Sequence, residues 1–525
     1  MKKAILIIII FLSCIQVHAQ YFNNRYFFDR PLMSYQSLIV QDSIVYVSGI
    51  SVTSYSPYPT VPCLSTISLV GDSMQNSIYI GADSNRFIQT WFNALNVSSD
   101  GYFYNIGYTD PGVAGADSAL LIKHDDSLNM IFYKVYERPG GAVRSFPLFD
   151  VLETDSGFMC LGIYHYDPDG LTNIVLLKTD SSGNELDRKV IGVPQYWDYA
   201  RTFTEIDGSY WITGTRGTFI STDSNAIFSK AYIIQTNENL DILDSWIDPA
   251  NGSYFITSVI ESSDSTITYC GAYTTGKEYI GGGNYFFLLQ GYIRTILKSD
   301  YSTVWDIKIG NPNNWTHFNE IKQLPDKSFI AIGELIDTIY PEGSDSAIWA
   351  DVGWLVKVSN MGQLIWERKY WGTLEGSETN YLSDFEVLPN GDIIACGESR
   401  SNVPGDPVPQ QGWLIRVDSF GCLVPGCQLV GIEEPEQETK IEFIKIFPNP
   451  TDDWLYIYFN APQSFDTEEF SFTITNMNGE IIEQQPAVQN FTTYFLETRN
   501  YASGVYFVYL MRNGELVQTE KFVKQ

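Results

Sequence analysis

The stretch Phe318–Tyr370, FNEIKQLPDKSFIAIGELIDTIYPEGSDSAIWADVGWLVKVSNMGQLIWERKY, contains four runs of strand-forming residues. Residues 318–324 alternate in polarity, Pro325-Asp326-Lys327 is a turn, and residues 328–333 return as a second run. A long loop rich in Asp, Gly and Pro precedes a third run, residues 354–358, and a short turn leads to a fourth, residues 364–371. The stretch therefore predicts one antiparallel sheet of four strands.

The same unit recurs along the chain, and the second strand of each copy ends on a glycine. Successive copies lie 52 to 64 residues apart. A period of this size with four strands per unit is typical of a β-propeller, in which each sheet buries its faces against its neighbours. We therefore predict an all-β fold whose residues 20–427 form a seven-bladed β-propeller. The seven glycines are Gly49, Gly107, Gly162, Gly214, Gly271, Gly333 and Gly397.

The seventh unit has no fourth strand of its own. Its third run leads into Cys422-Leu423-Val424-Pro425-Gly426-Cys427, where Pro and two Gly disfavour a strand. Arg25–Phe28 precedes the first unit and is not needed there, so we expect it to complete the seventh sheet and to cover an open edge. Cys422 and Cys427 are close enough in sequence to form a disulfide in an oxidising compartment.

The units resemble the propeller repeats of bacterial surface proteins, including delta-60-type and quinoprotein-like blades, over about residues 21 to 421. This resemblance implies the fold and no particular activity.

The composition excludes some classes of partner. Lys and Arg number 32 and Asp and Glu 62, which gives a net charge of −30. Such a surface repels the phosphates of nucleic acids and anionic lipids, so we expect no nucleic-acid partner. High net charge also keeps an exported protein soluble.

The N-terminus has the three parts of a secretory signal. Lys2 and Lys3 precede the apolar run Ala4–Leu12, and Val17-His18-Ala19 resembles a cleavage site. We predict a signal peptide at residues 1–19. The alternative is lipidation at Cys14. The apolar run is too short to span a bilayer permanently, and we predict no transmembrane segment in the mature chain.

One face of the predicted ring carries the long loops, because alternating strand directions bring the loops after the second and fourth strands together. Aromatic residues on this face could form a platform for a sugar or a peptide, or they could cap the interfaces between blades. The candidate ligand-binding residues are Trp91, Trp197, Trp315, Trp371 and Tyr381.

Catalytic and metal-binding motifs are scarce. After residue 19 the chain has His124, His165 and His317, without a zinc-protease or nucleophile-elbow pattern. We expect His124 to lie in an exposed turn. Carboxylates in the loops could ligate calcium, but none follows an EF-hand pattern, and no other cofactor or metal is expected. A pair of carboxylates could act as a glycosidase, which sequence alone cannot test.

A different domain follows the propeller. Residues 428–440 include Glu433-Glu434-Pro435-Glu436-Gln437-Glu438, too polar to pack, and are predicted to be a linker. Residues 441–525 contain about seven short alternating runs, which favours a small immunoglobulin-like β-sandwich.

Five blocks of this domain resemble, in order, the type A C-terminal sorting domain of the type IX secretion system of Bacteroidota. Phe447 replaces the usual tyrosine of the first block. The blocks are Phe447–Pro450, Trp454–Ile457, Asn476–Gly479, Gly504–Phe507 and Lys521–Lys524, and the sorting residues that they imply are Pro448, Asn449, Pro450, Gly479, Gly504, Tyr506, Lys521 and Lys524.

The resemblance implies recognition by the outer-membrane translocon and by a sortase-like peptidase. It also implies a protein that passes the periplasm and is secreted or attached to the outer cell surface. For the propeller, the sequence favours a non-enzymatic protein that binds a glycan or a protein. The alternatives are an extracellular polysaccharide-degrading enzyme and a structural surface-layer protein.

Overall fold

The computed structural model forms two compact units, Met1–Gly431 and Ile432–Gln525. All regular structure in the described residues is β-strand. Those residues contain no helix that is long and apolar enough to cross a membrane. The structure describes residues 21–28, 32–52, 60–79, 86–90, 94–110, 117–166, 171–193, 196–219, 227–249, 252–281, 284–339, 348–372, 378–401, 409–427, 444–447, 449–459, 470–477, 480–486, 493–512 and 515–524.

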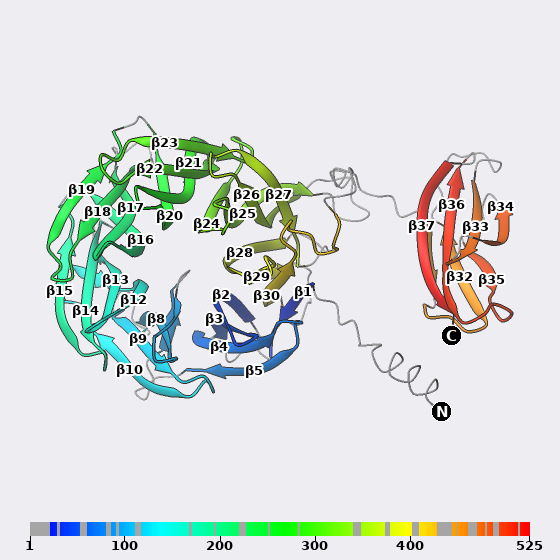
Figure 1. Ribbon diagram of the computed structural model, residues 1–525, viewed down its shortest axis with the longest axis horizontal. Helices are drawn as coiled ribbons and strands as arrows, with labels where there is room; N and C mark the ends of the chain where they lie inside the picture. The colour runs from blue at the N-terminus through cyan, green and yellow to red at the C-terminus, as the bar shows by residue number, and fades with distance from the viewer. Residues whose placement is uncertain are drawn as a thin grey trace, which may run out of the picture. The chain divides into compact units, whose positions relative to one another are not determined.

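The first unit consists of antiparallel sets of strands that stand side by side around a common centre (Figure 1). In sets such as β16–β19 and β20–β23, the first strand lies nearest the centre and the fourth lies outside (Figure 1). The first three sets are β2 (Leu32–Gln41), β3 (Ile44–Val52), β4 (Thr60–Ser68) and β5 (Ser73–Ile78); β6 (Arg86–Gln89) and β7 (Leu95–Val97) with β8 (Phe103–Asp110), β9 (Ala119–His124) and β10 (Met130–Tyr136); and β11 (Val143–Ser145) and β12 (Leu148–Thr154) with β13 (Gly157–Tyr166), β14 (Thr172–Asp180) and β15 (Glu185–Ile191). The next three are β16 (Trp197–Ile206), β17 (Ser209–Phe219), β18 (Ile227–Thr236) and β19 (Ile242–Ile247); β20 (Tyr254–Ser263), β21 (Thr266–Gly281), β22 (Asn284–Leu297) and β23 (Thr303–Ile309); and β24 (Thr316–Gln323), β25 (Phe329–Ile339), β26 (Ile348–Val358) and β27 (Leu364–Tyr370). The last set is β28 (Glu378–Val387), β29 (Ile393–Ser401) and β30 (Gln410–Val417) with β1 (Phe22–Tyr26).

The N-terminal strand β1 pairs antiparallel with β30, from Phe22 opposite Arg416 to Tyr26 opposite Gly412. The sequence predicted this pairing but placed the strand at residues 25–28. The strand ends earlier because Phe28 has a φ of 44°, which extended backbone cannot adopt. We call the pairing of β1 with β30 the seam. Asn23 stabilises it, since its Oδ1 accepts a hydrogen bond from Trp413 Nε1 at 2.6 Å and its Nδ2 donates to Trp371 O at 2.7 Å.

The repeated glycines occupy the closest approach between the first and second strands of each set. In most sets the register shifts directly after the residue opposite the glycine, so the first strand bulges there. A Cβ atom at Gly49 would lie 1.9 Å from Ser34 O, and one at Gly333 would lie 2.0 Å from His317 O. The bulge leaves no room for a side chain, which explains why the sequence repeats this residue.

The turns between third and fourth strands share one hydrogen-bond pattern. Asp180 Oδ1 accepts from Ser182 N at 2.9 Å and from Asn184 N at 2.7 Å. The Ser359 hydroxyl takes the same place in a later set, accepting from Met361 N and Gln363 N. A short polar side chain therefore holds each turn through backbone N–H groups.

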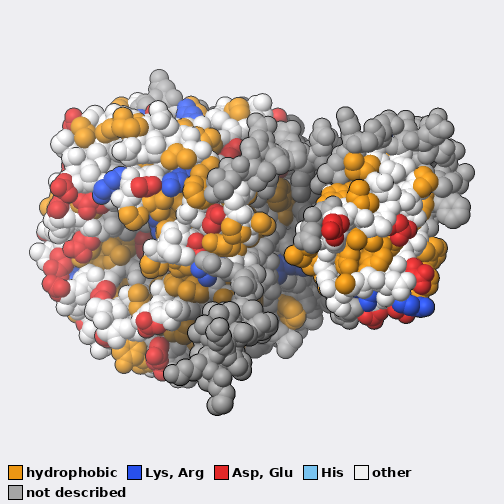
Figure 2. Space-filling model, turned by 45° about the vertical axis from the view of Figure 1, so that its right-hand side comes forward, with side chains coloured by type: hydrophobic (Ala, Val, Ile, Leu, Met, Phe, Trp, Pro, Cys, Tyr) orange, Lys and Arg blue, Asp and Glu red, His pale blue; other side chains and the backbone are white. Residues whose placement is uncertain are grey.

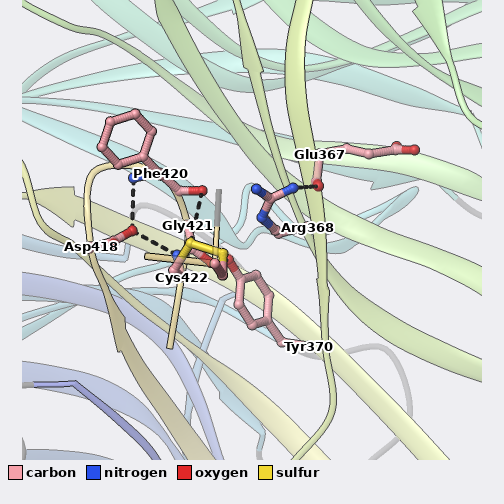
Figure 3. The surroundings of a disulfide bond; sticks show 8 residues. Glu367, Arg368, Tyr370, Asp418, Phe420, Gly421 and Cys422 are labelled. Carbon is pink, nitrogen blue, oxygen red and sulfur yellow. Dashed lines mark hydrogen bonds between the residues drawn. A yellow bond between two sulfur atoms is a disulfide. The ribbon is translucent and has the colours of Figure 1, made fainter. Parts of the chain in front are cut away.

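A disulfide joins Cys422 to Cys427, with Cα atoms 5.8 Å apart, where the chain leaves the last set (Figure 3). Asp418 Oδ1 holds the preceding turn through the N–H groups of Phe420 and Cys422 (Figure 3). The Tyr370 hydroxyl donates to Gly421 O at 2.6 Å. The strand β1 takes the fourth-strand position beside β30.

The prediction that His124 lies in an exposed turn was wrong. The strand β9 continues through this residue, which pairs with Phe103 and Met130 and is fully buried. Its ring lies 4.7 Å from that of Tyr79. Burial lowers the pKa of His124 to about 3, so the imidazole is neutral.

The second unit contains two sheets that share one core. One sheet has the order β31 (Ile444–Phe447), β32 (Trp454–Phe459), β35 (Thr493–Glu497); the other has β34 (Ile481–Pro486), β33 (Phe470–Asn476), β36 (Gly504–Arg512), β37 (Glu515–Lys524). Alternate residues such as Leu455 and Ile457 in one sheet and Phe472 and Val508 in the other are buried in this core. Hydrophobic side chains also gather on the visible face of this unit (Figure 2).

Candidate functional site

A cavity of about 660 Å³ opens in the first unit between the sets that start with β16, β20, β24 and β28. It combines aromatic rings with carboxylates, arginines and a histidine. Its volume lies within the range of about 300–1,000 Å³ that is usual for small-molecule sites. It is lined by Trp197, Arg201, Ser229, Ser253, Phe255, Thr274, Phe287, Leu289, Trp315, His317, Asn319, Glu334, Asp351, Thr379, Tyr381 and Arg400.

Trp197 and Phe255 form an aromatic wall of the cavity, and Tyr199 packs against both rings without lining the cavity itself. The rings of Trp197 and Tyr199 are stacked with centroids 5.0 Å apart and an angle of 11° between their planes. Phe255 on β20 continues the wall, 6.1 Å from Tyr199. The Arg201 guanidinium lies 4.8 Å from the centroid of Phe255, an attractive cation–π contact that holds a positive charge beside the wall.

Glu334 on β25 also lines the cavity and is held by Trp315, directly before β24, and by His317 on β24. Trp315 Nε1 donates to Glu334 Oε1 at 3.2 Å and also lies 3.1 Å from His317 Nδ1. His317 is paired with Glu334 across the sheet, and its Nδ1 is 3.5 Å from Glu334 Oε1. Burial, and next the charge of Arg201, lowers the pKa of His317 to about 4, so this histidine is neutral at pH 7.

Asp351 lies on the strand next to Glu334 and lines the same cavity. Glu334 is opposite Gly353 and Asp351 is opposite Ile336, so the two acids are diagonal neighbours on one face of the sheet. Burial raises the pKa of Glu334 to about 7, and the charge of Glu398 adds to this effect. Burial, and then the charge of Glu334, raises the pKa of Asp351 to about 6.

A third carboxylate, Glu398, organises the side of the cavity formed by β28 and β29. Its Oε2 accepts from the Tyr381 hydroxyl at 2.8 Å and from Gln410 Nε2 at 2.9 Å. Its Oε1 accepts from Arg400 NH2 at 2.8 Å. Because all three partners donate to one carboxylate, this network fixes the positions of Tyr381 and Arg400 at the cavity wall.

The structure brings together three of the five aromatic residues that the sequence singled out, since Trp197, Trp315 and Tyr381 line the cavity. Trp371 is not among the lining residues; it packs on the hydrophobic cluster around Phe318. Trp91 lies outside the described residues. Their part in ligand binding stays a prediction.

Sequence reasoning missed the charged residues of the cavity. A signal for two of them was available: Glu334 and Glu398 directly follow the repeat glycines Gly333 and Gly397. In the other copies this position holds Ile, Tyr, Thr or Ala. An acid at that point of an apolar strand interrupts the core pattern, which indicates a role other than packing.

In the second unit, residues of the first and last blocks that the sequence predicted for sorting meet; their part in sorting stays a prediction. Asn449 Nδ2 donates to Lys521 O at 2.8 Å, and its Oδ1 accepts from Val523 N at 3.0 Å. Tyr506 stacks on Phe522 at 5.3 Å. Gly504 and Lys524 form a pair between β36 and β37. Pro450 follows Asn449 through a cis peptide bond, whereas Pro448 and Gly479 lie outside the described residues.

Residues 445–525 match the family described as the secretion system C-terminal sorting domain. This sorting domain marks the chain for the type IX secretion machinery, with which it interacts. The protein is therefore exported to the cell surface or secreted.

Comparison with other proteins adds fold-level similarity only. No curated protein sequence matches the chain. Among solved structures, polysaccharide lyase Uly1 is 9% identical with a TM-score of 0.42, covering 73% of this chain and 90% of its own. The Penicillium chrysogenum alpha-L-arabinanase complexed with arabinobiose is 13% identical with a TM-score of 0.40, covering 76% and 98%. The Neurospora crassa Pan2 WD40 domain is 10% identical with a TM-score of 0.36, covering 77% and 92%. No functional argument rests on similarities this weak.

Proposed function

We propose that the protein is an exported seven-bladed β-propeller that binds a glycan in the cavity between β16 and β29. The sorting domain that delivers it is an immunoglobulin-like β-sandwich of type A, typical of Bacteroidota. The sets of strands, most of which have a glycine at a bulge of the first strand, support the blade count. The predicted signal peptide at residues 1–19 would direct the chain to the periplasm.

The composition of the cavity carries the proposal. Flat rings at Trp197, Phe255 and Trp315 offer apolar contact area at low entropic cost, and such area suits the apolar faces of sugar rings. Carboxylates and arginines between them can accept and donate hydrogen bonds to sugar hydroxyls. A peptide ligand would more often need an open sheet edge or a hydrophobic groove. The mixture of rings and charged groups therefore favours a glycan.

The glycan proposal can be tested on the purified full chain with a panel of oligosaccharides from bacterial and plant polysaccharides. We expect at least one to bind, measured by isothermal titration calorimetry. Trp197→Ala and Trp315→Ala should each weaken binding at least tenfold, because each removes an aromatic ring from the cavity lining. Trp454→Ala is a matched control, since this tryptophan is exposed in the second unit and does not line the cavity. No binding by any oligosaccharide, or equal binding by all variants, would contradict the proposal.

A further inference from the structure

We propose, building on the proposed glycan binding, that the cavity hydrolyses the glycosidic bond of its ligand, with Glu334 as the proton donor and Asp351 as the base. Both carboxyl groups line the cavity that would hold the glycan. They come from adjacent strands, β25 and β26, of one sheet. They are thus held by the scaffold rather than by a loop.

The register makes the two acids diagonal neighbours on one face of the sheet. Diagonal neighbours in an antiparallel pair have Cβ atoms roughly 7 Å apart. Glycosidases that use one displacement by water hold their two carboxyl groups about 6.5–9.5 Å apart, a span that the side chains of a glutamate and an aspartate with this Cβ spacing can reach. Gly353 is opposite Glu334, and the side chains of Trp413 and Leu382 fill the space that a side chain at Gly353 would take.

The surroundings of the two acids differ in a way that separates their roles. Burial and the charge of Glu398 raise the pKa of Glu334 to about 7, against the opposing effect of the hydrogen bond from Trp315. Asp351 receives a hydrogen bond from Thr379 and lies near Arg400 and His317, and its pKa is about 6. Asp351 is the more acidic of the two groups and ionises first, which leaves the proton on Glu334, as a base and an acid require.

The neighbouring groups do not compete for these roles. His317 is neutral and its Nδ1 lies 3.1 Å from the Trp315 N–H, so Nδ1 has no proton of its own to give to Glu334. The Tyr381 hydroxyl donates to Glu398, and burial raises the pKa of Tyr381 well above its usual range. Arg400 is also held by Glu398. These residues position the ligand and the acids.

The reaction consumes one water molecule and needs no other reagent. Asp351 takes a proton from water as the water oxygen forms a bond to the anomeric carbon. The bond between that carbon and the glycosidic oxygen breaks, and Glu334 gives its proton to the departing oxygen. Solvent then returns a proton to Glu334 and removes one from Asp351. The anomeric configuration is inverted.

The test uses the full chain and the oligosaccharides identified by binding. We expect the wild-type protein to release reducing ends, and Glu334→Gln and Asp351→Asn each to lower kcat at least 100-fold while the glycan still binds. Glu238→Gln is the matched control, because this exposed residue pairs with Lys178 away from the cavity. Proton NMR of the first product should show inversion.

The outcomes separate this inference from the proposed function. Binding without release of reducing ends from any bound glycan would overturn the inference and leave glycan binding intact. Hydrolysis that persists in Glu334→Gln, or retention of configuration, would also overturn it. The absence of any binding would overturn both.

Discussion

Replacement of Gly49 by alanine tests the explanation of the repeated glycines. The added Cβ would lie 1.9 Å from Ser34 O and 3.0 Å from Tyr35 Cα. Heavy atoms without a bond between them prefer about 3.5 Å. The strands β2 and β3 would therefore have to separate by more than about 1 Å at this point, because both contacting atoms belong to the backbone and cannot rotate away.

The loss in the free energy of unfolding can be worked out from the hydrogen bonds that such a separation breaks. Ladder hydrogen bonds of about 2.9 Å would stretch to about 4 Å, beyond bonding distance. Two lost bonds at about 0.5–1.5 kcal/mol each give about 1–3 kcal/mol. Backbone shifts forced by overpacking cost a similar amount, about 1–3 kcal/mol. We expect Gly49→Ala to lower the free energy of unfolding of the first unit by this amount.

The assay is urea unfolding of the full chain, followed by tryptophan fluorescence. Gly276→Ala in β21 is the matched control, since the nearest atom to its added Cβ is Leu288 Cδ1 at 3.4 Å, an ordinary contact. That variant should stay within about 0.5 kcal/mol of the wild type. Equal stability of Gly49→Ala and the wild type, or equal loss in both variants, would refute the steric explanation.

Three further predictions concern the seam, acid stability and export. Asn23→Ala should cost about 1–2 kcal/mol in the same urea assay, because it leaves the buried indole N–H of Trp413 unpaired; Arg25→Ala, an exposed neighbour, should cost less than 0.5 kcal/mol. His124 has a pKa of about 3 in the folded chain against about 6.5 when unfolded, so the unfolded chain binds more protons between these values and stability falls as pH drops below 6.5. His124→Phe should reduce the pH dependence of the free energy of unfolding by about 1.4 kcal/mol per pH unit, measured by urea unfolding at pH 6.5 and 5. An unchanged dependence on pH would show that other groups cause the loss of stability. Deletion of residues 504–525 removes β36 and β37 and should leave the first unit folded but retained in the periplasm, measured by cell fractionation and protease resistance; normal surface delivery would contradict the role of the sorting domain.

The spacing of the glycines predicted the repeat, because a steric requirement that recurs in every sheet must recur in the sequence. The reason for each glycine was not visible there, since the carbonyl that fills its space, such as Ser34 O at Gly49, comes from a bulge in another strand. His124 shows the opposite error. A histidine after a lysine was interpreted as part of a turn, although the pairing of β9 carries it into the core.

Part of the cavity was predictable from the order of the strands along the chain. Topology placed the long loops and Trp197 and Trp315 on one face, because strand direction follows from order along the chain. The acids could not be paired by sequence, since Glu334 and Asp351 are 17 positions apart and meet only through the register of β25 and β26. Their raised pKa values depend on burial by four separate sets of strands. Such an environment leaves no local pattern in the sequence.

The pairing of β1 with β30 also sets the order of events during biosynthesis. Phe22 meets Arg416, 394 positions later, so the last sheet cannot be completed until nearly the whole first unit has been synthesised. Contacts between such distant segments form slowly, and until then β30 offers an unpaired edge to other chains. The sorting domain at residues 445–525 lies beyond this point. Only a chain long enough to complete its last sheet therefore contains the sorting domain. A chain whose synthesis stops before this domain lacks the signal for export to the surface.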